Sequence, residues 1–127
     1  MTQIAPEVAN PTTPLMKAAR EGNAAAVAAL IQAGADLNAR NADGNNALWL
    51  ACFGSNPEVI DALLAAGIDI DNQNDNRATC LMYASSAGKD AVVARLLKAG
   101  ANARLESLDG YTALDMASTI ECLRLLR

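Results

Sequence analysis

The sequence predicts an all-α solenoid of helix–turn–helix units joined by β-hairpin-like loops, with about three full repeats and a shortened C-terminal capping repeat. The main observation is that leucine, alanine and glycine each recur at a constant interval of 33 residues, the distance from Leu15 to Leu48. The recurring positions are Leu15, Leu48, Leu81 and Leu114, then Ala18, Ala51, Ala84 and Ala117, and finally Gly34, Gly67 and Gly100. A period of this length is typical of supersecondary units that bury their apolar faces only by stacking on one another.

Length and composition suit one domain of this kind. The chain has 127 residues, of which 52% are apolar and only 3% aromatic, so we expect a core of alanine and aliphatic side chains. This length is sufficient for a continuous core of about three or four repeats. We expect a flexible lead-in over residues 1–9, which is polar to neutral, and a single repeat domain over residues 10–127. The repeats are expected at about residues 10–40, 41–73, 74–106 and 107–127.

The charge and the absence of targeting signals narrow the class of partner. The formal net charge of −4 disfavours nucleic acid and anionic membranes, because both select clustered lysine and arginine. No apolar run reaches the roughly 18 residues of a transmembrane helix, and the N-terminus lacks the basic start and apolar middle of a signal peptide. The three cysteines have no C-x-x-C spacing, which favours free thiols in a reducing cytosol. The predicted location is cytoplasmic, with export after removal of a signal as the alternative.

The first helix of each repeat is predicted from its two ends. Each helix begins after a residue whose side chain can cap a helix N-terminus, namely Thr13, Asn46, Thr79 and Thr112. Pro14 suits the first helical position, because the N–H that proline lacks would have no partner there. After about two turns the helix is expected to stop at a residue that can take the left-handed conformation. These stops are Gly22, Ser55 and Gly88.

The second helix of each repeat is predicted from apolar periodicity. Val27, Leu30 and Ile31 form an apolar stripe that recurs in the next two repeats, and the helix is expected to end at the recurring glycines. Neither helix is long enough to persist alone in water, so stacking must stabilise both. The connecting loops are rich in Asp, Asn and Gly, which favour turns, so we expect hairpin-like fingers.

The repeat unit resembles the ankyrin repeat. Thr13–Gly22 matches the family pattern T-P-L-H-x-A-A-x-x-G except at the histidine, and Gly34–Ala39 matches G-A-D-x-N-A. The finger glycine, present as Gly44 and Gly110, is replaced by Arg77 in the third repeat. The resemblance covers about residues 10–127 and implies a domain that binds another protein through a concave groove of first helices and fingers. The residues at the family's histidine position are Met16, Trp49, Met82 and Asp115.

No feature of the sequence predicts catalysis, a cofactor or a metal site. The chain has no histidine, which removes Ser-His-Asp and Cys-His catalysis and histidine-based metal sites. Cys52 falls where the repeat needs a small core residue, so packing is favoured over a nucleophile. The acidic run Asp69–Asn76 lacks the glycine of a calcium-binding EF-hand loop, and Cys80 stands where the bidentate glutamate should be. An enzyme is therefore the least favoured interpretation.

The candidate partner-binding residues lie on the first helices and the fingers. The chain has four aromatic residues, and none of them falls in a predicted second helix. Adjacent aromatic side chains in a desolvated hollow are typical of interface hot spots, and acidic finger residues would form a rim for a partner with basic edges. The predicted contact residues are Leu50, Phe53, Tyr83, Ser86 and Tyr111, together with Asp43, Asn45, Asp75, Arg77 and Asp109 from the fingers.

A structural role is the alternative to partner contact for the aromatic and acidic residues. Trp49, the remaining aromatic residue, is expected to support the core or a loop rather than to contact a partner. Tyr83 can pack on a neighbouring repeat, and Tyr111 can brace the last finger. The finger acids can serve only to form turns.

The sequence predicts an adaptor or scaffold that binds another protein. A dedicated inhibitor that covers a partner enzyme's active site, such as an antitoxin, is the alternative. We expect a monomer, with a weak dimer through the last helix as the alternative. The apolar residues of that helix that would either close the core or mediate the dimer are Leu123, Leu125 and Leu126.

Overall fold

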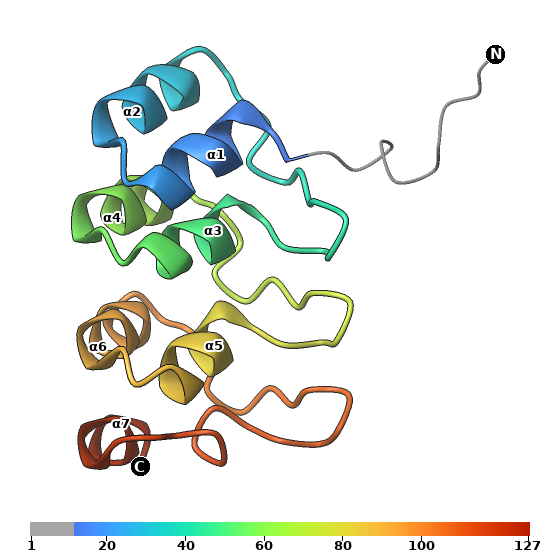
Figure 1. Ribbon diagram of the computed structural model, residues 1–127, viewed down its shortest axis with the longest axis vertical. Coiled ribbons are helices and arrows are strands. Elements are labelled where there is room, and N and C mark those ends of the chain that lie inside the picture. The colour runs from blue at the N-terminus through green and yellow to red at the C-terminus, as the bar shows by residue number, and fades with distance from the viewer. Residues whose placement is uncertain (1–11) are drawn as a thin grey trace, which may run out of the picture. The chain divides into compact units, whose positions relative to one another are not determined.

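The structure is a computed structural model that describes residues 12–127, and the lead-in expected over residues 1–9 lies outside them. The described chain contains seven α-helices and no strand, which confirms the all-α prediction. These described residues divide into two compact units, residues 12–68 and Asp69–Arg127, which are called unit 1 and unit 2 below and are described separately. Figure 1 shows that each unit consists of short helices with loops that project from them. The single domain over residues 10–127 stays a prediction.

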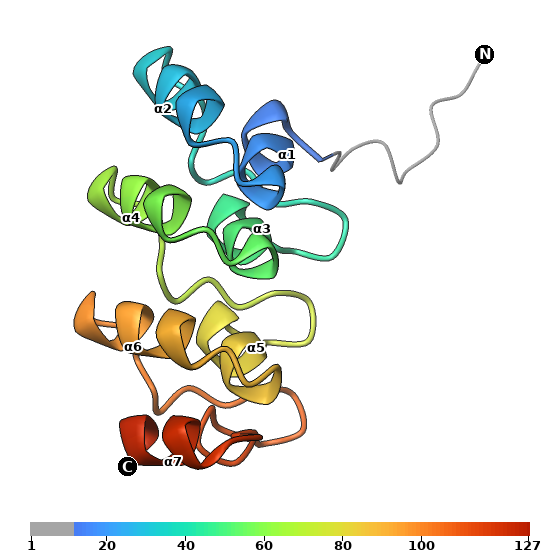
Figure 2. The same cartoon turned by 60° about the vertical axis from the view of Figure 1, so that its left-hand side comes forward.

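Unit 1 contains two pairs of helices. They are α1 (Pro14–Glu21), α2 (Ala24–Gln32), α3 (Ala47–Gly54) and α4 (Pro57–Ala65). Each helix packs on its counterpart in the other pair, α1 on α3 and α2 on α4, as Figure 2 shows. The recurring leucines and alanines lie in this core, where Leu15, Leu48 and Ala51 are buried. The sequence period therefore marks the positions that stacking removes from water.

The first helices of unit 1 begin and end where the sequence predicts. The hydroxyl of Thr13 accepts a hydrogen bond from the backbone N–H three residues later at 3.1 Å, and the Asn46 side chain accepts the equivalent bond at 3.2 Å. Gly22 follows α1 with a φ of 72°. Ser55 takes the same left-handed conformation after α3, with a φ of 59°. Both conformations end a helix by turning the chain away from its axis.

Unit 2 contains the helices α5 (Cys80–Ser86), α6 (Asp90–Lys98) and α7 (Ile120–Leu126). α6 packs on both α5 and α7. The first helix expected after Thr112 is reduced to turns over residues 113–116. The segment between Leu114 and the last helix is shorter than in the other repeats, so the chain reaches α7 before a second helical turn forms. The fourth repeat is shortened as predicted, but the expectation that Thr112 caps an α-helix is wrong.

A buried serine holds the shortened repeat against α5. The hydroxyl of Ser85, which is 0% exposed, donates a hydrogen bond to the carbonyl of Ala113 at 2.6 Å. The Ser85 carbonyl accepts two bonds from Ser118, at 3.2 Å from its backbone N–H and at 3.3 Å from its hydroxyl. The same position carries Ala19 and Cys52 in the first two repeats, so the strong hydroxyl donor occurs only beside the shortened repeat.

The position that carries histidine in the ankyrin repeat is filled in several ways. Met16 places its sulfur atom 3.5 Å from the backbone N–H of Thr13, and Met82 makes the equivalent contact in the third repeat. Asp115 uses its carboxylate instead, which accepts the backbone N–H of Thr112 at 2.9 Å. Trp49 is buried, in agreement with its expected supporting role. Thioether sulfur is a weak acceptor, so the methionines replace the imidazole mainly by packing.

Candidate partner-binding surface

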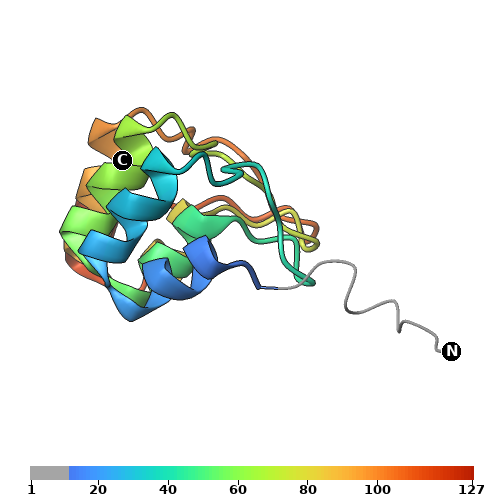
Figure 3. The same ribbon diagram turned by 90° about the horizontal axis from the view of Figure 1, so that it is seen from above.

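The finger loops project away from the helices in each unit, as the view from above shows (Figure 3). In unit 1 the backbone N–H of Asn41 donates to the carbonyl of Asn45 at 2.9 Å, and the fingers over residues 74–78 and 107–111 of unit 2 repeat this bond. The Asn41 side chain also accepts the backbone N–H of Asp43 at 3.0 Å. These bonds give each finger a fixed hairpin turn, as the Asp- and Asn-rich sequences predict.

The fourth residue of each finger has a left-handed backbone conformation. It is glycine in two fingers, where Gly44 has a φ of 81° and Gly110 a φ of 82°. Arg77 occupies the same position in the third repeat with a φ of 57°, a conformation that costs a residue with a side chain roughly 1–2 kcal/mol. The Arg77 carbonyl accepts a hydrogen bond from the Gln73 side chain at 2.8 Å. The backbone that carries the exposed Arg77 side chain is therefore held in one conformation.

The two fingers of unit 2 are bonded to each other. The backbone N–H of Leu108 donates to the carbonyl of Asn76 at 3.0 Å. Nearer the helices, the backbone N–H of Asn102 donates to the Asp71 carboxylate at 2.8 Å. Paired loops lose less conformational entropy when they bind a partner than free loops do. The exposed charged residues that these fingers carry are Asp75, Arg77 and Asp109.

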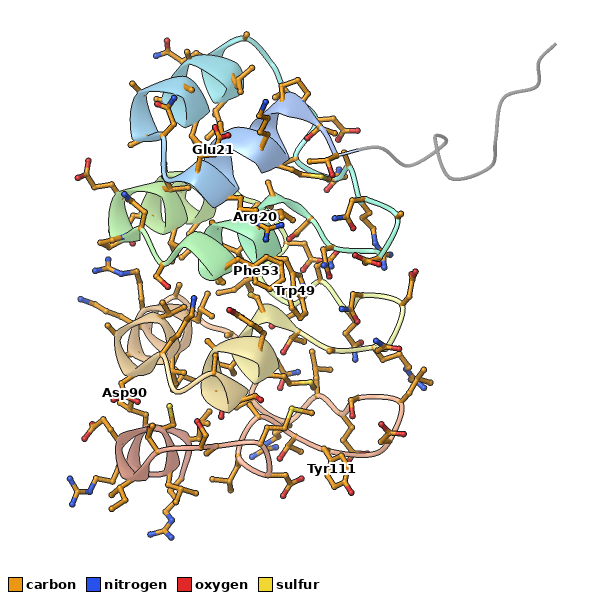
Figure 4. The ribbon with its side chains drawn as sticks, in the orientation of Figure 1. Arg20, Glu21, Trp49, Phe53, Asp90 and Tyr111 are labelled. Carbon is orange, nitrogen blue, oxygen red and sulfur yellow. The ribbon has the colours of Figure 1, made fainter. Side chains whose placement is uncertain are left out.

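Unit 1 places an aromatic pair beside a cation. Phe53 on α3 is partly exposed, and its ring centroid lies 6.0 Å from that of the buried Trp49, with the rings tilted by 57°. The guanidinium of Arg20 on α1 lies 5.5 Å from the Phe53 centroid. Figure 4 shows the three labelled side chains along α1 and α3. A cation over a ring at an exposed site stabilises by about 0.5–1 kcal/mol, so this surface is apolar with a positive edge.

Gly54 allows α1 and α3 to approach each other beside this pair. A Cβ atom at Gly54 would lie 2.5 Å from the backbone oxygen of Arg20, closer than real Cβ contacts. The obstacle would be backbone, which cannot rotate aside as a side chain can. The missing side chain of Gly54 therefore permits the helix spacing at which Arg20 covers Phe53.

Unit 2 has a second pairing of a cation with an aromatic ring. The ammonium of Lys89 lies 5.2 Å from the ring centroid of Tyr83, which is partly exposed on α5. Ser86, at the end of the same helix, is exposed. Tyr111 in the last finger is also exposed, which leaves its ring available for contact.

Two of the predicted contact residues are buried, and the structure corrects their assignment. Leu50 is 3% exposed, because α3 is buried over nearly its whole length and not only on its core face. Asn45 is 5% exposed, because it lies at the base of its finger next to the cap of α3. Neither side chain can reach a partner in this structure. The partner-binding role of the remaining residues stays a prediction, and all of them are partly or fully exposed: Asp43, Phe53, Asp75, Arg77, Tyr83, Ser86, Asp109 and Tyr111.

Sequence reasoning did not predict that Arg20 and Lys89 cover the aromatic rings. For Arg20 a signal was present, because Arg20 and Phe53 are separated by one period of 33 residues and so occupy the same position in consecutive repeats. Stacking brings such positions side by side. Lys89 lies outside this register relative to Tyr83, and no sequence signal indicates that pairing.

A carboxylate in unit 2 joins α6 to α7. Asp90 accepts hydrogen bonds from the Thr119 hydroxyl at 2.7 Å and from the Cys122 thiol at 3.1 Å. These two bonds, the one from Thr119 foremost, hold the pKa of Asp90 below its usual value. Burial is the main cause that raises the pKa of the Cys122 thiol, which therefore stays protonated at neutral pH. The arrangement fixes the last helix and leaves no reactive thiolate.

Within residues 12–127, no group of three or more His, Cys, Asp or Glu side chains is placed to hold a metal ion. No helix in that range is both long enough and apolar enough to cross a membrane. Unit 1 has an apolar hollow of about 260 Å³ at the start of α1, lined by Thr13, Pro14, Leu15, Leu30, Ala35 and Asp36.

The family of the chain follows from its sequence profile as well as from its fold. The profile described as "Ankyrin repeats (3 copies)" matches residues 2–74 and 56–127. The chain belongs to the ankyrin repeat family. Ankyrin repeats are in general protein–protein interaction modules and typically not enzymes. Among curated proteins, no match is found.

Proposed function

We propose that this chain is an adaptor or scaffold module that binds another protein through its first helices and fingers. The observation that carries the proposal is the partly exposed Phe53 ring, backed by the buried Trp49 and covered by the Arg20 guanidinium. Aromatic residues and arginine dominate the hot spots of protein interfaces, where they supply apolar area together with hydrogen-bond donors. A partner side chain that displaced the guanidinium would bury the ring and leave Arg20 free to pair with a partner carboxylate.

The fingers supply the polar part of the proposed interface. Asp43 in unit 1 and Asp75 and Asp109 in unit 2 are exposed acids at finger turns. They favour a partner with basic groups at its edges, and Arg77 adds one position that selects an acidic group. Because hydrogen bonds already order the finger backbones, the fingers would lose little conformational entropy when a partner binds.

The proposed location is the cytoplasm. All three cysteines, Cys52, Cys80 and Cys122, are free and buried. Free thiols are typical of proteins in reducing compartments, where disulfides do not persist.

Capture from a lysate of the source organism tests the proposal. We expect the wild-type chain to retain a protein that Phe53→Ala loses while circular dichroism shows that the variant is folded. Gln32→Ala is the matched control, because Gln32 is exposed in the same unit but lies on α2, away from the Arg20–Phe53 pair. Equal capture by all three proteins would contradict a binding role for Phe53.

The activity of the captured partner separates an adaptor from an inhibitor. An adaptor leaves that activity unchanged when the chain is present at saturating concentration. Loss of the activity would instead identify a dedicated inhibitor, the alternative function that the same surface could serve.

A further inference from the structure

The exposed charges of unit 1 differ in sign between its first and its second helices. α1 carries the cations Lys17 and Arg20 and one acid, Glu21, as its last residue, and α3 has no charged residue. α2 has no charged residue either, whereas α4 carries the acids Glu58 and Asp61. The first helices therefore have a net positive charge, although the formal charge of the whole chain is −4.

The two cations of α1 lie on one face of the helix and are available to a partner. Lys17 and Arg20 are three positions apart, so their side chains are neighbours about one turn apart. Both are exposed, and within residues 12–127 neither side chain makes a hydrogen bond or an ion pair. The Phe53 ring attracts the Arg20 guanidinium, but it leaves the N–H groups in the guanidinium plane without an acceptor.

We propose that the partner contacts this surface with an acidic protein segment, in which a carboxylate pairs with Arg20 and a neighbouring apolar side chain packs on Phe53. This inference rests on the proposed function and names the chemistry of the partner at the same site. The apolar side chain takes the place of the guanidinium on the ring, and the carboxylate beside it receives the displaced guanidinium. Arginine binds a carboxylate through two parallel N–H···O bonds, which also fix the orientation of the two groups.

The exchange replaces one weak contact by two stronger ones. A cation over an aromatic ring at an exposed site stabilises little, whereas burial of a ring and a charge-assisted pair each contribute more. The ring also has a fixed place, because the buried Trp49 lies behind it with the ring centroids 6.0 Å apart. A side chain that is already held in place loses little conformational entropy when a partner covers it.

The geometry also defines how the partner's acid and apolar residue are spaced. The Arg20 guanidinium and the Phe53 ring centroid, both labelled in Figure 4, are 5.5 Å apart. Residues three or four positions apart on a helix surface have Cβ atoms about 5–6 Å apart, so a helical segment meets this spacing. A second acid one turn further along such a segment would reach Lys17.

The same charges disfavour a basic segment and a nucleic acid at this surface. A basic segment would meet Lys17 and Arg20 with charge of the same sign, and the basic edges of a partner belong at Asp43 on the finger. Nucleic acid binding depends on several phosphate contacts, for which two cations on an acidic chain are too few.

Selection from a random peptide library displayed on phage, with the full chain immobilised, tests the proposal. We expect the enriched peptides to carry Asp or Glu within about four positions of a large apolar residue more often than the starting library does. The dissociation constant of one enriched peptide is then measured by fluorescence polarisation. Arg20→Gln should weaken its binding about tenfold or more, because a hydrogen-bonded charge pair is lost. Lys17→Gln, which should also weaken binding, is the second variant if Arg20→Gln fails to fold.

The matched control is Ala25→Glu, which lowers the net charge by one, as Arg20→Gln does, at an exposed site in the first turn of α2. This control should bind the peptide like the wild type. Enriched peptides without acids would overturn the proposal, as would a failure to enrich any peptide or unchanged binding by the folded cation variants. If peptides without acids still lose affinity for Phe53→Ala, the proposed binding surface stands and only the acidic partner is wrong. If the peptides bind Phe53→Ala as tightly as the wild type, the binding surface fails as well.

Discussion

The guanidinium of Arg20 lies 5.5 Å from the centre of the Phe53 ring, although the two residues belong to different helices. They occupy the same position in consecutive repeats. Stacking of repeats therefore converts a period in the sequence into a row of side chains across the first helices of unit 1. This row, visible in Figure 4, is the part of the surface that we assign to partner binding.

Gly54→Ala tests the helix spacing beneath this row. We expect the variant to lose about 1–3 kcal/mol of unfolding free energy, because the added Cβ would meet the Arg20 carbonyl oxygen. The loss should appear even though alanine favours a helix by about 1 kcal/mol over glycine. Urea denaturation followed by the fluorescence of Trp49, the only tryptophan, measures it beside the substituted site. An unchanged or higher midpoint would show that the two helices are not in contact there.

Ser85→Ala tests the attachment of the shortened repeat. The substitution removes the hydroxyl that donates a hydrogen bond to the carbonyl of the buried Ala113 at 2.6 Å. We therefore expect the unfolding free energy to fall by about 1–3 kcal/mol. Hydrogen exchange should show the faster opening in residues 107–127. Ser118→Ala is the control, because its hydroxyl is exposed and makes a longer bond, and it should cost less than about 1 kcal/mol. Equal effects of the two substitutions would argue against the Ser85 anchor.

Arg77→Gly should stabilise the finger of the third repeat. Arg77 has a φ of 57°, and glycine adopts this conformation without the steric cost of a side chain, so we expect a gain of about 0.5–1 kcal/mol. Gly110→Ala is the converse control and should lose about 1 kcal/mol. Since no heavy atom lies within 4 Å of a Cβ at Gly110, that loss reports backbone strain alone. Thermal unfolding measures the effects of both substitutions on stability. Destabilisation by Arg77→Gly would contradict the proposed strain in the Arg77 backbone.

The stability that Asp90 confers should depend on pH. Its pKa in the folded chain is held below the usual value of 3.8, chiefly by the Thr119 hydroxyl, so its contribution is present above that value. The contribution is lost as the pH falls through the folded pKa. The difference in unfolding free energy between the wild type and Asp90→Ala should therefore shrink between about pH 5 and about pH 2.

Thr119→Val provides the control for this titration. This substitution removes the foremost cause of the lowered pKa of Asp90. The difference in unfolding free energy between Thr119→Val and the double variant Asp90→Ala/Thr119→Val should therefore vary less over the same acidic range. A pH-independent difference between the wild type and Asp90→Ala would contradict the assignment.

Features that depend on near neighbours in the sequence were predictable. Thr13, Asn46 and Thr79 cap their helices as expected, because the capping bond joins residues only three apart. The finger turns are equally local, since Asn41 accepts the N–H of Asp43. These interactions require no knowledge of what packs on the helix.

Burial and close approach were not predictable in the same way. A spacing of three and four residues places Leu50 on one helix face with Phe53, but it does not reveal that a neighbour also covers that face at Leu50. The sequence likewise does not reveal that Gly54 lies where a backbone carbonyl from another helix approaches. Both properties belong to pairs of repeats and not to a single repeat.

The most direct measurement is the dissociation constant of the captured partner for the wild-type chain and for Phe53→Ala, by isothermal titration calorimetry. A hot-spot aromatic is worth at least about 2 kcal/mol, so binding should weaken about 30-fold or more in a variant that remains folded. The Gln32→Ala control should bind like the wild type. A Phe53→Ala variant with wild-type affinity would show that the partner binds elsewhere, and the assignment of the Arg20–Phe53 surface would be wrong.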